Sequence, residues 1–318
     1  MNGVSKKITL VGNFRSPYSS ESQYLDTLRN LGHEVFPLQE QATSSEKILE
    51  QGLQSDLVVF IHTHGWETPG EPLSAVFKKL KKKKIPVITY HLDLWFGLKR
   101  EIDLKDDFYK ELSYFFTVDK LMADWFNENT KVKGYFIPAG VYDQEVKMMK
   151  PQQVGYSIVF TGSGTYHPEF PYRTELISFL KQTYGRKFIH IGNDGQVSAR
   201  HGLELNQIYR NAKITVGDTL NIGFDYPYYS SDRLFEQTGR GAFTIYPWIK
   251  GIDDWFVDGK EIVTYKHGDL QDLKQKIDYY LNAGVEREAI RIEGHLRTAN
   301  QHTYKHRWTE ILNEVFKK

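Results

Sequence analysis

The chain contains no cysteine, and this absence excludes three kinds of chemistry. Disulfide bonds, thiolate metal sites and a cysteine nucleophile all require a thiol. Disulfides belong mainly to oxidising compartments, so the composition agrees with a cytoplasmic protein. A signal peptide is also not expected, because the first apolar run, Ile8–Val11, is short and has the pattern of a strand.

An excess of one charge and long hydrophobic runs are missing as well. Lys and Arg number 41 against 40 Asp and Glu, which gives a formal net charge of +1. A surface that binds duplex DNA usually carries a basic excess, so here only a local patch would supply one. No segment approaches the roughly 18 consecutive apolar residues of a membrane-spanning helix. We therefore expect an ordinary globular protein without a transmembrane segment.

Strand-like and helix-like segments alternate along the 318 residues, which suffice for two domains. Strands are expected at 8–11, 34–36, 57–62, 86–90, 114–118, 157–161, 188–191, 213–216, 242–246 and 262–265. Helices are expected at 21–31, 73–82, 173–183, 203–212, 231–240, 269–282 and 287–316. This alternation predicts α/β domains with parallel sheets that carry helices on both faces.

A polar stretch at Lys147–Gln153 has the composition of a linker. It divides an N-terminal domain over 1–150 from a C-terminal domain over 151–318. The last helix, at about 301–318, is expected to pack back on the first domain. Because open parallel sheets bind ligands beyond the carboxyl ends of their strands, the loops after strands are the places to look for chemistry.

A loop of small residues follows the first strand of the second domain. Gly162, Ser163, Gly164 and Thr165 allow backbone N–H groups to approach a phosphate, which makes them candidate phosphate-binding residues. The loop matches neither the full dinucleotide-binding pattern nor a Walker sequence. A plain tight turn is the alternative interpretation.

The predicted helix at 231–240 carries the most informative pair of charges. Arg233 and Glu236 are three residues apart and share one helical face, and Ser231 or Asp232 is expected to cap the helix. An arginine near a helix N-terminus suits a diphosphate, and a glutamate one turn later can accept both hydroxyls of a ribose. The alternative is an Arg–Glu pair on a solvated face.

This segment resembles the R-x-x-E-x-x-x-x-G stretch of GT-B glycosyltransferases, particularly the CgeB-like, spore-maturation-protein-type group, and is similar to glycogen-synthase-like enzymes. Further similar stretches are Gly32–Val35, Tyr135–Val141, Leu205–Ile214 and His302–Arg307, so the resemblance spans nearly the whole chain. It implies two Rossmann-like parallel-sheet domains facing an interdomain cleft, an acceptor-side domain over 1–150 and a nucleotide-sugar-binding domain over 151–318. The glycine loop at 162–165 would then be on the donor side. The resemblance also implies a nucleotide diphosphate sugar as donor, for example a UDP-sugar, with no metal or other cofactor.

The resemblance implies that Glu236 binds the ribose, and we expect Arg233 to offset the diphosphate charge. Retaining members often carry another glutamate eight positions before the ribose-binding one, and here Tyr228 stands in that place. Asp225 or Asp232 would be a substitute. Retention or inversion of the anomeric configuration therefore stays open.

One further loop is expected to carry catalytic residues. His91 and Asp93 follow a strand and resemble the family's H-x-D loop, in which the histidine lies near the reacting sugar. An imidazole or a carboxylate there can act as general base on an acceptor hydroxyl. A strand-end histidine followed by a helix-capping aspartate is the alternative.

The remaining candidates lie on the acceptor side. His62 and His64 follow a strand and look like part of a metal site, but a zinc site needs further ligands and none is evident. We expect these histidines in an acceptor-side loop, with a metal as the lesser alternative. Asn13, Ser19 and Glu21, in the loop after the first strand and at the start of the next helix, are expected to face the acceptor as well.

A basic run at Lys78–Lys84 has two interpretations. Cations at a helix C-terminus complement the helix dipole, and such a run can also bind phosphates of anionic lipids or nucleic acids. The leading prediction is a cytoplasmic glycosyltransferase, hexosyl- or pentosyl-, whose acceptor is a glycan, a lipid-linked sugar, a protein or a modified DNA base. Alternatives are a phage-type DNA-base glycosyltransferase of the same fold and a catalytically silent nucleotide-sugar-binding protein.

Overall fold

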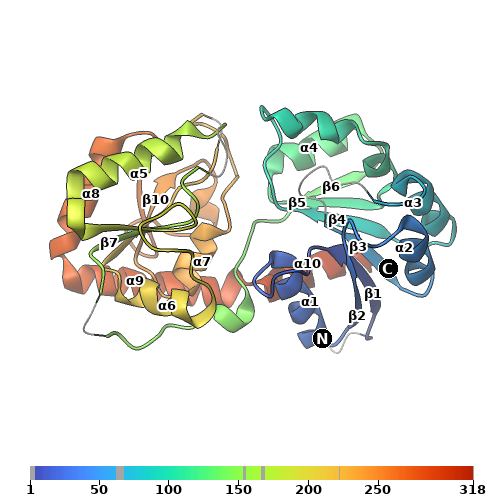
Figure 1. The fold of residues 1–318 in the computed structure, drawn as a ribbon, viewed down its shortest axis with the longest axis horizontal. Coiled ribbons are helices and arrows are strands. Elements are labelled where there is room, and N and C mark those ends of the chain that lie inside the picture. Colours follow the sequence, from blue (N-terminus) through green and yellow to red (C-terminus); the bar gives the residue numbers. More distant parts are fainter. Residues whose placement is uncertain (1–3, 62–67, 153–154, 166–168, 222, 318) are drawn as a thin grey trace. The chain divides into compact units, whose positions relative to one another are not determined.

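The computed structural model describes residues 4–61, 68–152, 155–165, 169–221 and 223–317. The chain forms two compact units (Figure 1). Unit 1 contains Met1–Pro138 and Tyr304–Lys318, and unit 2 contains Ala139–Thr303. Each unit is an α/β domain built on a parallel sheet, as the alternation of segments predicts. Among the described residues, no helix combines the length and the apolar character needed to cross a membrane.

The sheet of unit 1 has six strands in the order β2-β1-β3-β4-β5-β6 within the described residues. The strands are β1 Lys7–Gly12, β2 Glu34–Gln39, β3 Leu57–Phe60, β4 Val87–His91, β5 Tyr114–Thr117 and β6 Lys133–Phe136. The helices are α1 Ser20–Asn30, α2 Ser45–Gly52, α3 Leu73–Lys82, α4 Lys120–Asn129 and α10 Tyr304–Val315, with 3-10 helices η1 Lys99–Lys105 and η2 Asp107–Glu111. Every described strand pair is parallel, so the carboxyl ends of all six strands lie along one edge.

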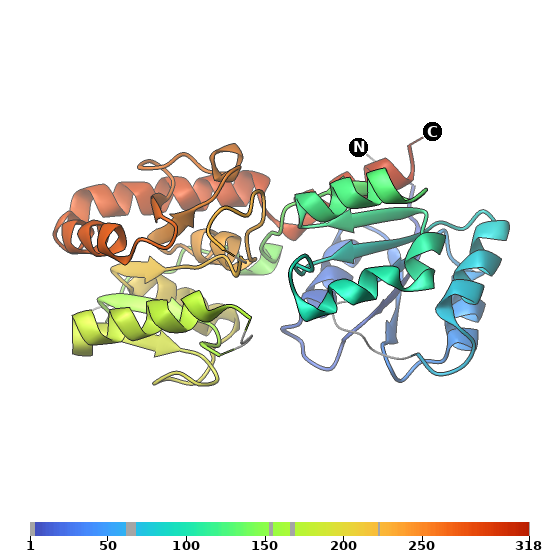
Figure 2. The same cartoon turned by 90° about the horizontal axis from the view of Figure 1, so that it is seen from above.

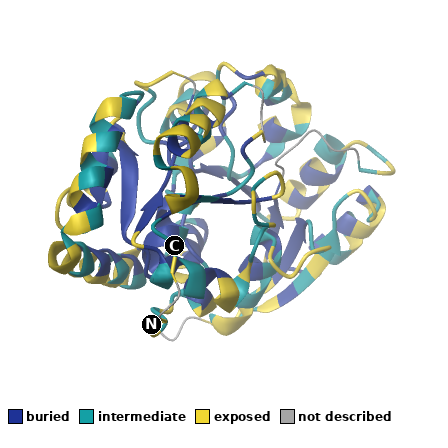
Figure 3. Ribbon diagram, turned by 60° about the vertical axis from the view of Figure 1, so that its left-hand side comes forward, coloured by how far each residue is buried: buried dark blue, intermediate teal, exposed yellow. Residues whose placement is uncertain are grey.

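Apolar side chains on both faces bury this sheet. All four residues of β3 are buried, as expected for a central strand that is covered on both sides (Figure 3). Side chains of α2, α3 and α4 belong to the core on one face. On the other side, the ring of Tyr24 in α1 packs against Tyr304 and Trp308 of α10, with centroids 4.7 and 5.3 Å away. The C-terminal helix is thus part of the first unit.

The sheet of unit 2 has five strands in the order β11-β10-β9-β7-β8, again all parallel in the described residues. The strands are β7 Ile158–Thr161, β8 Phe188–Ile191, β9 Ile214–Val216, β10 Thr244–Trp248 and β11 Val263–Lys266. The helices are α5 Pro171–Tyr184, α6 Gly202–Asn211, α7 Arg233–Gly239, α8 Leu270–Asn282 and α9 Gly284–Gln301, with 3-10 helices η3 Asp143–Glu145, η4 Gly185–Lys187 and η5 Ile252–Asp254. Helices α5 and α8 cover one face, while α6 and α9 lie on the other (Figures 1 and 2).

The prediction of one helix over 287–316 is wrong. Helix α9 ends at Gln301 and α10 begins at Tyr304. Between them the carbonyl of His302 accepts a hydrogen bond from the N–H of Val141 at 3.1 Å, and Thr303 forms a parallel bridge with Val141. The backbone therefore pairs with an extended segment at this point and leaves the helical conformation.

Candidate functional site

The loop after β7 begins with a residue whose conformation and surroundings require glycine. Gly162 has φ of +115°, in the region that L-residues with side chains avoid. Its N–H donates to the carbonyl of Ile191 at 2.8 Å, and its carbonyl lies 2.7 Å from Nε2 of His190. A Cβ atom at this position would collide with the guanidinium of Arg233. The guanidinium of Arg233 therefore packs directly against the backbone of Gly162.

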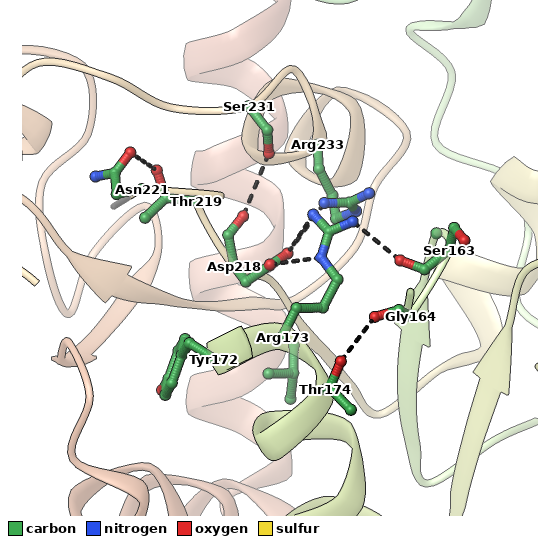
Figure 4. Close-up of polar contacts among 12 residues, drawn as sticks. Ser163, Gly164, Tyr172, Arg173, Thr174, Asp218, Thr219, Asn221, Ser231 and Arg233 are labelled. Carbon is green, nitrogen blue, oxygen red and sulfur yellow. Dashed lines mark hydrogen bonds and ion pairs between the residues drawn. The ribbon is translucent and has the colours of Figure 1, made fainter. Parts of the chain in front are cut away.

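A buried carboxylate binds two arginines beside this loop (Figure 4). Asp218 follows β9 and is only 2% exposed. Arg173, in the first turn of α5, donates from Nε to Oδ2 at 2.6 Å and from Nη2 to Oδ1 at 3.0 Å. Arg233, which begins α7, donates from Nη1 to Oδ1 at 3.0 Å. Both guanidiniums also lie over the ring of Phe160, within 6 Å of its centre. The two cations are thus held in fixed places.

The buried part of this cluster carries a net positive charge, because Arg173 and Arg233 share the one buried carboxylate of Asp218, while Asp232 is exposed. Burial alone raises the pKa of Asp218, but Arg173 and Arg233 hold that pKa below its ordinary value. Burial lowers the pKa of Arg233, and the neighbouring Asp218 and Asp232 raise it above the ordinary value. The Arg233 side chain is 13% exposed against 3% for Arg173. Arg233 is therefore the arginine with surface left for an anionic ligand.

Glu236 lies one turn further along α7 with a partner of its own. Its Oε1 atom is 3.6 Å from Nη2 of Arg240, and its side chain is 29% exposed. Arg240 is buried, pairs with Glu145 and donates to Oδ1 of Asn206 at 2.8 Å. The alternative of a solvated Arg233–Glu236 pair is thus not what the structure contains, since the arginine's carboxylate partner is outside the helix. The carboxylate of Glu236 is therefore partly accessible, and it lies beside Arg240, a buried arginine that other residues hold in place.

The predicted side-chain cap of this helix is wrong. Asp232 is the N-cap residue, but its backbone is already helical and its side chain makes no capping hydrogen bond. The hydroxyl of Ser231 donates to the backbone carbonyl of Asp218 at 3.2 Å, which ties the helix start to the end of β9. Tyr228 has φ of +52°, and its ring packs against the backbone of Gly251. These contacts fix the loop that leads into the helix.

The N–H groups at the end of the glycine loop already have an anionic partner. The N–H of Gly164 is 2.9 and 3.1 Å from the two carboxylate oxygens of Asp194. The N–H and the hydroxyl of Thr165 donate to the same carboxylate at 3.0 and 2.9 Å. The carbonyl of Ser163 accepts from Nη1 of Arg173 at 3.0 Å. Of the four loop residues expected to bind a phosphate, two therefore direct their N–H groups to Asp194.

In unit 1, the two residues expected at the reacting centre differ in their burial. His91 ends β4 and is fully buried, with its ring 4.6 Å from that of Trp95 and stacked 6.0 Å from Phe115. Asp93 follows in the loop with its side chain 21% exposed and its carboxylate 3.8 Å from Arg100. Nδ1 of His91 lies 3.1 Å from the backbone carbonyl of Asp93. The histidine thus contacts the backbone of the loop that carries the aspartate.

The acceptor-side candidates near β1 surround a carboxylate. The hydroxyl of Ser19 donates to the carbonyl of Asn13 at 2.6 Å and accepts the N–H of Ser22 at the start of α1. Glu21 is 8% exposed, and its burial raises its pKa, to which the charge of Asp93 also contributes. Glu40, just beyond β2, has a pKa of about 7 because of burial and the charge of Glu21. The structure thus groups carboxylates that follow three different strands.

Two expectations concern segments outside these clusters. His62 and His64 lie outside the described residues. In the basic run, Lys78 is 3.6 Å from Glu111 and Lys79 is 2.5 Å from Glu71, while the residues 81–84 are exposed. The run lies at the C-terminal end of α3, as its dipole favours. In the described part of the chain, no group of three or more His, Asp or Glu side chains is placed to hold a metal.

Sequence reasoning missed Arg173, Asp218, Asp194 and Glu40. Asp218 lies two residues after a predicted strand, so the rule that loops after strands carry the chemistry would have found it. Glu40 directly follows β2, which extends three residues beyond the predicted strand at 34–36. Arg173 is the first residue of a predicted helix, next to the glycine loop. No local signal marks Asp194, which reaches that loop because β8 lies beside β7.

The chain is similar to one protein family and to several solved structures. Residues 173–313 match the family model described as "Glycosyl transferase-like". This range contains Arg173, Asp218, Arg233 and Glu236. No curated protein matches the chain significantly.

Solved structures of the same fold cover the chain almost completely. An alpha-glucosyltransferase in complex with UDP-glucose and DNA containing an abasic site matches with a TM-score of 0.68 at 10% identity, over 99% of this chain and 100% of that one. Anabaena HepE in complex with UDP and glucose matches with 0.67 at 11%, over 98% and 99%. Sucrose-phosphate synthase from Thermosynechococcus elongatus matches with 0.65 at 11%, over 98% and 99%. The predicted GT-B fold is thereby confirmed, and the family match supports the predicted class of enzyme.

Proposed function

We propose that this chain, a GT-B-fold protein with a glycosyl transferase-like second unit, moves a glycosyl group from a nucleotide diphosphate sugar to an acceptor hydroxyl. The observation that carries the proposal is the pair of arginines on Asp218 beside the glycine loop. Two fixed guanidiniums on one carboxylate leave a positive charge for the donor's diphosphate. The fold and the family match support the same class of reaction.

On the donor side, Arg233 binds the diphosphate and Glu236 accepts the ribose hydroxyls. The departing nucleoside diphosphate gains negative charge as the glycosidic bond breaks. A guanidinium already held in place stabilises that charge without reorganisation. We therefore infer a reaction that needs no metal, in which Arg233 supplies the charge. Arg240 holds the carboxylate of Glu236 where a ribose can reach it.

On the acceptor side, we propose that Asp93 touches the reacting groups and that His91 positions its loop. His91 is fully buried between aromatic rings, whereas the Asp93 carboxylate is partly exposed. Glu21, Asn13 and Ser19 belong to the acceptor side in this scheme. A carboxylate with a raised pKa, such as that of Glu21, is suited to accept a proton from a hydroxyl.

The finer assignment rests on the relatives and on the motif at His302–Arg307. Several solved structures of this fold hold UDP or UDP-glucose, so we propose a UDP-sugar as donor. We place the chain in the CgeB-like group and in the cytoplasm, in agreement with its lack of cysteine. The acceptor is a glycan, a lipid-linked sugar, a protein or a modified DNA base. The anomeric configuration of the product distinguishes retention from inversion.

A thermal-shift screen against UDP-, GDP-, ADP- and TDP-sugars tests the proposal. A ligand that binds only the folded state raises the apparent melting temperature, so one nucleotide class should stabilise the protein selectively. Slow release of the nucleoside diphosphate from that donor should then be detectable by chromatography. Absence of stabilisation by all four classes contradicts the proposal. Binding without any release or transfer would instead favour a silent nucleotide-sugar-binding protein, the alternative that Tyr228 in place of a glutamate suggests.

A DNA base is the second candidate acceptor. Structures of the same fold have been solved with DNA, and the exposed lysines at 81–84 offer a local basic surface. The near-neutral net charge opposes strong binding of duplex DNA. A gel-shift experiment with duplex DNA at moderate salt decides the matter: retention of the duplex favours this acceptor, and a free duplex excludes it.

A further inference from the structure

The polar groups of the glycine loop are nearly all engaged by the protein itself. The N–H of Gly162 donates to β8, and the carbonyl of Gly164 accepts the hydroxyl of Thr174 at 3.2 Å. The carbonyl of Ser163 accepts from Arg173 at 3.0 Å. Among the described residues, the N–H and the hydroxyl of Ser163 are the loop donors that have no such protein partner. Figure 4 shows this hydroxyl turned away from Arg173.

Asp194 holds the other end of the loop. Its carboxylate accepts the N–H groups of Gly164 and Thr165 and the hydroxyl of Thr165, all at 2.9 to 3.1 Å. Burial alone raises the pKa of Asp194, but these hydrogen bonds hold it below its ordinary value. The carboxylate is therefore ionised at neutral pH and is bound by three donors. A phosphate cannot take the same N–H groups without displacing a like charge from them.

We propose that Asp194 is a positioning residue that holds the glycine loop, so that Ser163 alone among the loop residues contacts the donor's diphosphate. Ser163 follows Gly162, whose backbone lies against the guanidinium of Arg233, the cation that we assign to the diphosphate. Gly164 and Thr165 serve the loop's shape and do not contact the donor. This inference rests on the proposed function.

The alternative is that the Asp194 carboxylate is a stand-in for phosphate: it occupies the position of a phosphate in the free protein and moves away when the donor binds. The two views predict opposite effects of removing its charge. If Asp194 positions the loop, Asp194→Asn loosens Ser163 and weakens binding of a diphosphate. If Asp194 is a stand-in, the same substitution removes a competitor and strengthens that binding.

Calorimetric titration of UDP and of uridine into the wild type and the variants tests the inference. For Asp194→Asn we expect UDP affinity to fall about tenfold, because a loosened Ser163 loses its hydrogen bonds to the charged diphosphate, while uridine affinity stays unchanged. Thr165→Val, which removes one of the hydrogen bonds to Asp194, should weaken UDP by a few-fold. Ser163→Ala should do the same without a change in melting temperature. A merely structural role would affect UDP and uridine equally.

The outcomes separate the inference from the proposed function. Tighter or unchanged UDP binding by Asp194→Asn overturns the positioning role, and unchanged binding by Ser163→Ala overturns the contact. If Asp194→Asn does not fold, Thr165→Val and Ser163→Ala decide the matter. If the wild type binds none of UDP, GDP, ADP or TDP, the proposed function fails and this inference fails with it.

Discussion

Nη1 of Arg233 lies 3.0 Å from Oδ1 of Asp218. The same carboxylate also accepts two hydrogen bonds from Arg173. The carboxylate is buried at the end of β9, and the two arginines come from the starts of two different helices. Asp218 therefore sets the place of the cation that we assign to the donor's diphosphate.

Replacing Asp218 tests whether this ion pair supports the fold as well as the site. Asp218→Asn leaves two buried guanidiniums without their counter-ion, so we expect a loss of about 3 to 5 kcal/mol in the free energy of unfolding. Urea denaturation measures this loss. Asp225→Asn, at an exposed position of the same loop, is the control and should change the free energy by less than about 0.5 kcal/mol. Equal effects of the two substitutions would contradict the role of Asp218.

Gly162→Ala should weaken both stability and donor binding. The substitution combines a positive φ with a collision against Arg233. Gly185→Ala is the matched control, because Gly185 also has a positive φ but no atom within 4 Å of an added Cβ. We expect Gly185→Ala to cost about 1 kcal/mol of backbone strain and Gly162→Ala to cost more. Only Gly162→Ala should also lower UDP affinity, and an equal affinity in both variants would show that the loop does not border the donor.

Glu236→Ala tests the ribose assignment. A carboxylate that accepts both ribose hydroxyls should make the wild type prefer UDP over 2′-deoxy-UDP. Loss of hydrogen bonds to a charged group corresponds to about 10- to 100-fold in affinity, so the variant should lose that factor for UDP and bind both nucleotides alike. Glu204→Ala, on the exposed side of α6, serves as the control. If Glu236→Ala keeps the wild-type preference for UDP over 2′-deoxy-UDP, Glu236 does not bind the ribose hydroxyls.

Glu40 predicts a particular dependence of stability on pH. Burial and the charge of Glu21 raise its pKa from 4.5 to about 7. Between these two values the folded chain keeps a proton that the unfolded chain has lost. The contribution of Glu40 to the free energy of unfolding is therefore present below pH 4.5 and is lost as the pH rises to about 7. Glu40→Gln should gain stability relative to the wild type over this window. Parallel curves of unfolding free energy against pH for the two proteins would refute the assignment.

The order of elements was predictable because apolar runs and helical spacing are local features. Arg233 and Glu236 stood out for the same reason, since they share a helical face in a single short segment. Their partners were not predictable in this way. Asp218 meets the glycine loop because β9 lies beside β7, and strand order is a property of the whole sheet. The spacing of residues along the sequence therefore did not predict that β9 pairs with β7.

The same reason explains why the split of the last helix was missed. His302 and Thr303 have no glycine or proline beside them that would stop a helix. The break is set by their pairing with Val141, more than 150 residues earlier in the sequence. The two aromatic rings around His91 are likewise a matter of packing, and from the sequence the histidine looked accessible.

The most direct test of the central claim is calorimetric titration of UDP into the wild type and Arg233→Gln. Glutamine is an uncharged polar side chain, so the substitution removes the charge that we assign to the diphosphate. We expect UDP affinity to fall by about 10- to 100-fold in Arg233→Gln, as for the loss of a charged hydrogen-bonded contact, and to stay unchanged in the control Arg186→Gln, an exposed arginine. Wild-type UDP affinity in Arg233→Gln would contradict the account.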